Sequence, residues 1–138
     1  MSQQVVIVDT GCANISSVKF AVERLGVNVQ VTDDKTKIRN ADKVFLPGVG
    51  AASAAMASIK RKELKSFIQS LEQPVLGICL GMQLMAESSQ ESPGSHLAQN
   101  RLDTVDCLNL IPTSITRMET NGLVLPHMGW NQIQVLSN

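Results

Sequence analysis

The chain has 138 residues, of which 43% are hydrophobic, so residues 1–138 can form one domain with a sizeable core. Its twelve basic and twelve acidic side chains cancel, and no block of Lys and Arg stands out, which argues against a nucleic acid or an anionic membrane as partner. The apolar run at residues 5–8 is too short for a secretory signal, and nowhere do about 20 apolar residues follow one another. We therefore expect a soluble, cytoplasmic protein with a small-molecule or protein partner.

Short apolar runs rich in β-branched residues predict strands at residues 5–9, 27–31, 43–47 and 74–78. The first and last runs are apolar enough to be buried on both faces, as in the middle of a parallel sheet. Between the first two strands, apolar residues at helical spacing predict a helix that begins after Asn14, a suitable N-cap, and closes on Gly26. These three elements form a β-α-β unit.

A second helix is predicted between the third and fourth strands. Its apolar face consists of Met56, Ile59, Leu64, Phe67, Ile68 and Leu71. Pro74 prevents this helix from continuing into the next strand. A polar stretch from residue 88 to about residue 104 and short alternating stretches after it predict a surface loop that leads into further strands. The expected fold class is α/β, with a Rossmann-like, doubly wound, mostly parallel sheet and mixed or antiparallel strands in the C-terminal part.

Cys79 stands between two glycines in the sequence GICLG, where a predicted strand ends and a helix begins. This is the arrangement of a nucleophile elbow, in which Gly77 and Gly81 allow a sharp turn and a close approach of the backbone. The sulfur would then lie at the carboxyl edge of the sheet, where open α/β sheets bind ligands. At that position the N–H of Leu80 could donate to a developing oxyanion.

A second oxyanion donor is available from the segment PGVGAA, residues 47–52. It leaves its strand through two glycines and can turn the N–H of Val49 or Gly50 toward the same edge. The same segment lacks the GxGxxG pattern and a following Walker lysine, which argues against nucleotide binding.

The alternative for Cys79 is a buried thiol beside glycines that serve packing alone. For Cys12 and Cys107, which lack the glycine frame, this alternative is favoured. The three cysteines have no CxxC spacing, and no cluster of His, Cys, Asp and Glu has metal-ligand spacing, so neither a disulfide framework nor a metal or other cofactor is expected.

A cysteine nucleophile also needs an acid–base partner, which is usually histidine. The only histidines are His96, in the polar loop, and His127. We expect His96 to be solvated and His127 to lie at a strand turn or an interface, so neither is favoured as the catalytic base.

Four stretches, PVLGICLGMQLM, FLPGVG, DTGCANISSVK and LPHMGWNQI, together resemble the glutaminase subunit of imidazole glycerol phosphate synthase. GICLG alone would indicate only the wider class I glutamine amidotransferases. PHMGWN narrows the resemblance to this subunit, together with a GxxNxxS pattern formed by Gly11, Asn14 and Ser17. The similarity runs from about Val5 to Val135.

The resemblance implies hydrolysis of glutamine to glutamate and ammonia. The ammonia would pass through a partner cyclase subunit during histidine biosynthesis, in a heterodimer whose glutaminase is weak until the cyclase binds its own substrate. Cys79 would form a glutamyl thioester. Matching positions imply these further roles: oxyanion stabilisation by Val49, Gly50 and Leu80; substrate binding by Gly48, Gly50 and Gln83; and contact with the cyclase by Asn14, His127, Met128, Gly129, Trp130 and Asn131.

The sequence departs from the family in two places. The family's catalytic histidine and glutamate lie in a segment well beyond PHMGWN, and residues 1–138 contain no counterpart of it. We therefore expect these residues to represent the N-terminal two thirds of the domain, to be inactive alone, and to be marginally stable or self-associating because of exposed strand edges. Residues 95–104 look like an insertion, for which loop variation is favoured over a contact with the partner or a cover over the site.

Two other readings remain. The chain could be an interaction module that binds the cyclase without turning over glutamine. It could also be another α/β cysteine hydrolase that uses the same elbow on a different substrate, although that reading leaves PHMGWN unexplained.

Overall fold

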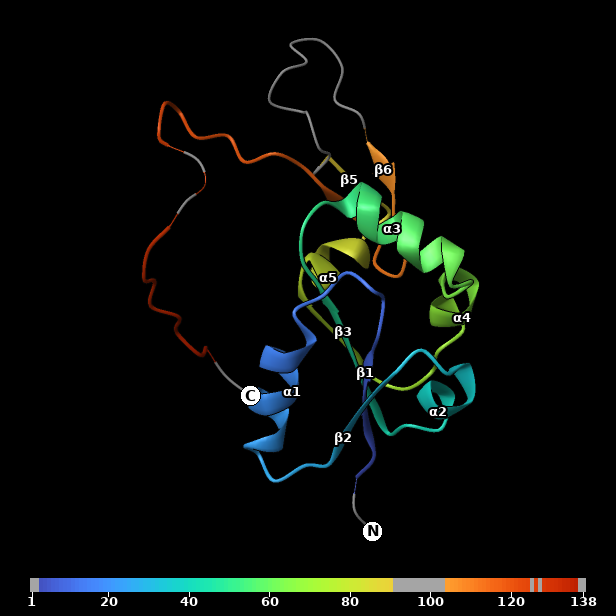
Figure 1. Cartoon of the computed structure of the whole chain (residues 1–138). Coiled ribbons are helices and arrows are strands. Elements are labelled where there is room, and N and C mark those ends of the chain that lie inside the picture. The colour runs from blue at the N-terminus through green and yellow to red at the C-terminus, as the bar shows by residue number, and fades with distance from the viewer. Residues whose placement is uncertain (1–2, 91–103, 125, 127, 137–138) are drawn as a thin grey trace.

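A computed structural model describes residues 3–90, 104–124, 126 and 128–136 of the chain (Figure 1). In chain order its elements are β1 (Val5–Val8), α1 (Ile15–Glu23), β2 (Val29–Thr32), α2 (Lys35–Arg39), β3 (Lys43–Gly48), α3 (Ala52–Arg61), α4 (Lys65–Gln69), β4 (Val75–Cys79), α5 (Leu80–Leu84), β5 (Ser88–Ser89), β6 (Val105–Asp106) and β7 (Ser114–Ile115).

The centre of the molecule is a four-stranded sheet with the strand order β2-β1-β3-β4, in which all pairs are parallel. This confirms the predicted fold class. Strand β1 is buried at all four positions between β2 and β3, as the sequence predicts. Among the described strands β4 is an edge, and its Leu76 is 57% exposed, so the prediction that residues 74–78 are buried on both faces is wrong. The apolar composition of a strand shows that its side chains can be buried. Whether they are buried depends on the strands and helices that pack against it.

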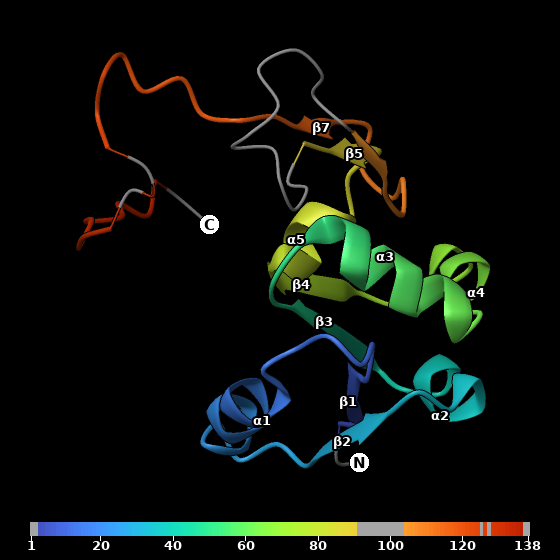
Figure 2. The same cartoon turned by 45° about the horizontal axis from the view of Figure 1, so that its top comes forward.

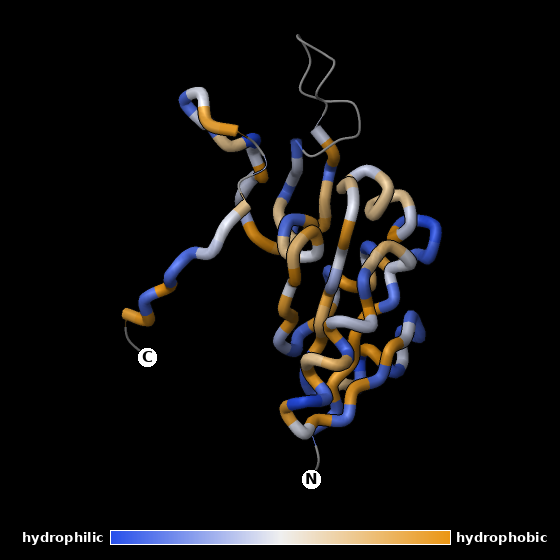
Figure 3. The backbone as a smooth tube through the Cα atoms, turned by 60° about the vertical axis from the view of Figure 1, so that its left-hand side comes forward, coloured by the Kyte–Doolittle hydropathy of each residue, from blue (hydrophilic) through white to orange (hydrophobic). Residues whose placement is uncertain are grey.

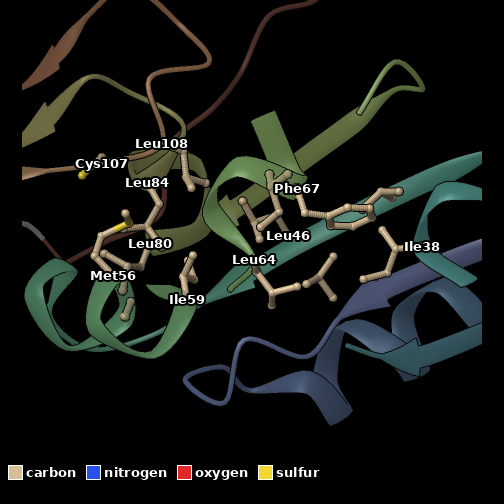
Figure 4. Close-up of a cluster of buried hydrophobic side chains, with 14 of the residues drawn as sticks. Ile38, Leu46, Met56, Ile59, Leu64, Phe67, Leu80, Leu84, Cys107 and Leu108 are labelled. Atoms are coloured by element: carbon tan, nitrogen blue, oxygen red, sulfur yellow. The ribbon is translucent and has the colours of Figure 1, made fainter. Parts of the chain in front are cut away.

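Because successive side chains of β1 point to opposite faces of the sheet, this strand contributes to two hydrophobic cores, one on each face. Val5 and Ile7 pack with Val22 of α1 on one face. Val6 and Val8 point to the other face, where helices α2, α3, α4 and α5 contribute the larger cluster. Figure 4 labels its members Ile38, Leu46, Met56, Ile59, Leu64, Phe67, Leu80, Leu84, Cys107 and Leu108. Helices on both faces give the doubly wound arrangement (Figure 2).

Helix α1 follows the prediction. The side-chain oxygen of Asn14 accepts from the N–H of Ser17 at 3.4 Å, which is N-cap geometry. The helix ends at Glu23, and Gly26 adopts a φ of +76° soon after it. Helix α2, by contrast, was not predicted; Asp34 caps it by accepting from the N–H groups of Thr36 and Lys37.

The single helix expected over residues 56–71 is wrong, because two helices, α3 and α4, occupy this range. The N–H of Glu63 donates to the carbonyl of Lys60, and that of Leu64 donates to the carbonyl of Ile59. This pair of bonds is a Schellman C-cap, and Glu63 takes the left-handed position in it with a φ of 54°. The apolar residues keep helical spacing on both sides of this turn, so the sequence pattern did not reveal that one helix ends and another begins.

The C-terminal part contains a three-stranded sheet with the order β6-β5-β7, antiparallel at one pair and parallel at the other, which confirms the mixed strands expected there. No helix or strand occurs among the described residues after 115, although alternation predicted strands there. Trp130 is fully exposed on this extended segment, where apolar and polar residues intermix (Figure 3). A strand forms where a neighbouring strand pairs with it, and the described strands pair only with one another. Most of the insertion at residues 95–104, including His96, lies outside the described residues, as does His127.

Candidate functional site

Cys79 is the last residue of β4 and the N-cap of α5, so the chain changes from strand to helix at this residue. Its φ of 54° and ψ of −121° lie outside the regions that residues with a side chain normally adopt. Such a conformation costs on the order of 1–3 kcal/mol and persists only where the surroundings enforce it. The side chain is exposed at the carboxyl edge of the sheet, which excludes the alternative of a buried thiol.

Three glycines let the backbone close around Cys79. A Cβ on Gly77 would lie 2.5 Å from the Cα of Met82, and a Cβ on Gly48 would lie 2.8 Å from the N atom of Gly81. Gly81 itself is pressed against the carbonyl of Leu46. Any larger residue at these positions would push α5 away from β3 and β4. The glycines flanking Cys79 therefore serve close approach, as the sequence motif predicts.

The parallel pairing of β3 and β4 places Gly48 directly opposite Cys79. The segment 48–50 therefore leaves the sheet beside the nucleophile candidate, as expected from the order of the strands. Leu80 is the first residue of α5, and no carbonyl of that helix can accept its N–H. Gly50 has a φ of +84° and open space around it, so the turn here depends on glycine.

The N–H of Val49 donates to the carbonyl oxygen of Cys12 at 3.1 Å. In this conformation the Val49 N–H is engaged away from Cys79. Sequence reasoning treated Cys12 only as a thiol and missed the role of its carbonyl. The position of Cys12 in the fold was the available signal. Residues 9–12 follow β1, which is the neighbour of β3, so this loop and the segment 48–50 leave the sheet at the same edge.

Gln83 lies on α5, one turn after Cys79. Its side-chain oxygen, Oε1, is buried and has no hydrogen-bond partner among the described residues. A buried acceptor without a donor is costly, and in native proteins such groups commonly mark a place where a ligand or water binds. An N–H group of a bound molecule would satisfy this oxygen.

Of the other two cysteines, Cys107 is buried as the sequence predicts, whereas Cys12 is only partly buried. Cys107 is 1% exposed within the larger core, and its burial raises the pKa of the thiol above the ordinary value. The thiol of Cys12 is half-buried against the same core.

The residues expected to contact the partner come from two separate parts of the sequence, Asn14 and the stretch 127–131. Asn14 caps α1 near the carboxyl edge of the sheet. Met128 and Trp130 are 87% and 103% exposed on the extended segment. Gly129 and Asn131 flank Trp130 on that segment.

The part of the chain that the structure describes contains no group of three or more His, Cys, Asp and Glu side chains able to hold a metal ion. Its helices are all too short or too polar to cross a membrane. A shallow hollow beside α2, lined by Lys35, Thr36, Arg39, Asn40 and Phe67, lies away from the edge that carries Cys79 (Figures 1 and 2).

A family model described as glutamine amidotransferase class-I matches residues 6–136, which include Cys79 and its glycine frame. The chain belongs to this family.

Three similar curated proteins are each described as an imidazole glycerol phosphate synthase subunit HisH. The protein from Colwellia psychrerythraea is 58% identical over 137 residues, covering 96% of this chain and 61% of the relative. That from Idiomarina loihiensis is 56% identical over 130 residues, covering 94% and 61%. That from Vibrio cholerae is 50% identical over 135 residues, covering 98% and 64%. The chain thus spans about three fifths of the length of the curated relatives it matches.

Among solved structures, a Listeria monocytogenes protein described as of the peptidase E kind superposes with a TM-score of 0.58 at 19% identity. The similarity covers 79% of this chain and 63% of that one. At this level of identity the likeness supports the α/β fold alone.

Proposed function

We propose that the protein carrying these residues is the glutaminase subunit of an imidazole glycerol phosphate synthase. It hydrolyses glutamine through a thioester on Cys79 and supplies ammonia to a cyclase partner in histidine biosynthesis. The observation that carries the proposal is the strained, exposed Cys79 at a strand–helix turn framed by close-packed glycines. The similarity to proteins described as HisH over at least 93% of the chain supports this choice within the class-I family.

In the proposed reaction the Cys79 thiol gives its proton to a base, and the sulfur attacks the side-chain carboxamide carbon of glutamine. A C–S bond forms, and the electron pair of the C=O double bond moves onto the oxygen. Collapse of this intermediate breaks the C–N bond and releases ammonia, provided that an acid protonates the leaving nitrogen. Water then hydrolyses the thioester to glutamate and restores the thiol. We assign the N–H of Leu80 to stabilisation of the oxyanion in both halves of the reaction.

The second oxyanion donor requires a change in the segment 48–50. Because the Val49 N–H is bonded to Cys12, we propose that this state has low activity and that binding of the partner's substrate turns the peptide toward Cys79. Glycines on both sides of Val49 make such a turn inexpensive for the backbone. This accounts for a glutaminase that is weak until the cyclase binds its own substrate.

We assign Gln83 to the binding of substrate glutamine, together with the backbone of Gly48 and Gly50. The unpartnered Oε1 of Gln83 is the supporting observation, because the amine or amide N–H groups of glutamine are the donors that it lacks. The exposed Met128 and Trp130, with Gly129, Asn131, Asn14 and His127, form the proposed contact surface for the cyclase.

The polypeptide of residues 1–138 by itself is proposed to be inactive, because neither of its histidines matches the family's catalytic one. The test compares it with the protein made from the natural gene, each mixed with the cyclase from the same organism. Binding without ammonia release by both proteins would instead select the interaction-module alternative.

The direct test of the chemistry is covalent labelling with a glutamine analogue that carries a diazoketone in place of the carboxamide. We expect the peptide containing Cys79 to gain the mass of one glutamine-like adduct in the natural-gene protein, and free glutamine to protect it. Cys79→Ser is the control, and Cys12 and Cys107 serve as internal references. Equal labelling of Cys12, or no protection by glutamine, would overturn the assignment.

A further inference from the structure

The loop that follows β1, residues 9–12, is fixed partly by its own side chains. The N–H of Gly11 donates to the Asp9 carboxylate at 2.9 Å, and the N–H of Cys12 donates to the hydroxyl of Thr10 at 3.4 Å. Thr10 is only 1% exposed, and Gly11 has a φ of +75°. This loop presents the Cys12 carbonyl that accepts from Val49.

Helix α3 holds the same loop at two successive carbonyl groups. The hydroxyl of Ser58 donates to the carbonyl of Thr10 at 2.7 Å, and the ammonium of Lys62 donates to the carbonyl of Asp9 at 2.9 Å. Lys62 is the C-cap residue of α3 and lies four residues after Ser58, so the two side chains project from the same face at the C-terminal end of this helix. Both lie on the side of α3 that faces the carboxyl edge of the sheet.

Lys62 is itself held in place by two carboxylates. Its ammonium lies 2.9 Å from the Asp33 carboxylate, just after β2, and 3.6 Å from the carboxylate of Asp9. Its side chain is 27% exposed, so the charge interacts in a partly desolvated position. A bond from a charged donor in such a place is stronger than one between neutral groups.

These contacts connect α3, the loop 9–12 and the candidate oxyanion segment 48–50 to one another. Helix α3 begins at Ala52, close after Val49 in the chain, and grips the loop 9–12 through Ser58 and Lys62. The loop in turn accepts the Val49 N–H at Cys12. The Val49 peptide is therefore connected to α3 in two ways, directly along the chain and through hydrogen bonds by way of the loop 9–12.

We propose that Lys62 is a positioning residue, assisted by Ser58, that holds the loop 9–12 where its Cys12 carbonyl engages the Val49 N–H, and so keeps the resting glutaminase rate low. This inference rests on the proposed function and adds a means of regulation to it. Lys62 acts from α3 and through the loop, without touching substrate. Loss of its bond loosens the loop and makes the turn of the Val49 peptide toward Cys79 more frequent.

The experiment uses the natural-gene protein in complex with its cyclase, as wild type, Lys62→Met, Lys62→Arg and Lys60→Met. Lys60→Met is the matched control, because Lys60 is an exposed lysine on the same helix. Ammonia release is measured at saturating glutamine with and without the cyclase's substrate, and hydrogen exchange of the Val49 amide is followed by NMR.

We expect Lys62→Met to raise the unstimulated kcat by roughly three- to tenfold, with the stimulated kcat and the KM for glutamine unchanged, since one hydrogen bond contributes modestly. The Val49 amide should exchange faster by a similar factor. Lys62→Arg, which keeps a charged donor, should restore the low rate, and Lys60→Met should match wild type.

Equal losses of the stimulated and unstimulated rates in Lys62→Met, with unchanged exchange at Val49, would show that Lys62 only stabilises the fold and would overturn the inference. If wild type releases no ammonia in either state, the proposed function fails first. The exchange of Val49 then still decides whether Lys62 controls this peptide.

Discussion

The backbone of Gly81, in the first turn of α5, lies directly against the carbonyl group of Leu46 in β3. This contact brings the helix after Cys79 down onto the sheet. Leu80 and Leu84, at either end of α5, are thereby buried in the larger core.

Gly81→Ala should therefore be strongly destabilising, because a Cβ would overlap backbone atoms that cannot move without separating α5 from the sheet. We expect the free energy of unfolding to fall by about 3 kcal/mol or more in urea titrations. Gly26→Ala is the control, because Gly26 has a φ of +76° but open space around it, and it should cost only about 1 kcal/mol. Equal losses in the two variants would mean that backbone conformation, not close packing, governs Gly81.

Because the backbone of Cys79 is strained, we expect that a substitution at this residue can abolish activity and yet increase stability. Cys79→Gly should raise the free energy of unfolding by about 1 kcal/mol over Cys79→Ala, since glycine adopts a φ of 54° without steric cost. Both variants should lose ammonia production and keep binding to the cyclase. Residual ammonia production by Cys79→Ala would contradict the role of the nucleophile, and equal stability of the two variants would contradict the strain.

Gln83→Leu should weaken glutamine binding without harming the fold. The change removes a buried acceptor that has no protein partner among the described residues, so the free energy of unfolding should stay equal or rise. We expect the KM for glutamine to rise by about tenfold or more, as for loss of a buried hydrogen bond to substrate. A variant that loses stability while its KM is unchanged would assign Gln83 to the fold instead.

Glu63 occupies the position of the Schellman turn that usually carries glycine. Glu63→Gly should raise the free energy of unfolding by about 0.5–1 kcal/mol, because the left-handed conformation is unfavourable for glutamate. The ion pair lost with Lys35, at 3.8 Å with a Glu63 side chain that is 85% exposed, should contribute little. Lys35→Met tests that pair alone, and a lower midpoint of thermal unfolding in Glu63→Gly would show that the pair outweighs the strain.

The ion pair of Asp33 and Lys62 predicts a pH dependence of stability. The hydrogen bond from Lys62, followed by its charge, holds the pKa of Asp33 below the ordinary 3.8. The same bond raises the pKa of Lys62 above 10.5. Stability from Asp33 is therefore present above pH 3.8 and is lost as the pH falls through the lowered pKa, whereas that from Lys62 is present below pH 10.5 and is lost as the pH rises through the raised pKa.

Asp33→Asn should accordingly lower the urea midpoint at neutral pH and low salt, and the curves of variant and wild type should converge below pH 3.8. High salt should reduce the difference, because Asp33 is exposed. Glu72→Gln, at an exposed carboxylate elsewhere, is the control for a general charge effect. A difference that stays constant from neutral pH to below 3.8 would contradict the ion pair as its cause.

Local sequence predicted the four parallel strands, the capped helix α1 and the placement of Cys79 between glycines. Each of these depends on residues that are neighbours in the chain: β-branched runs favour strands, Asn14 caps its own helix, and GICLG makes its own turn. The family resemblance followed from the same short stretches. These properties could be read from the sequence because their causes lie within a few residues.

Tertiary structure alone decided how those pieces meet. Two hydrogen bonds join segments that are distant in the chain: the bond from Val49 to Cys12 and the bond from Lys62 to the loop after β1. The side-chain oxygen of Gln83 lacks a partner because of the groups that surround it in the fold. The exposure of Leu76 on β4 likewise depends on which elements cover the sheet. Hydrogen bonding and burial are set by the groups that come into contact, and only the folded chain specifies those contacts.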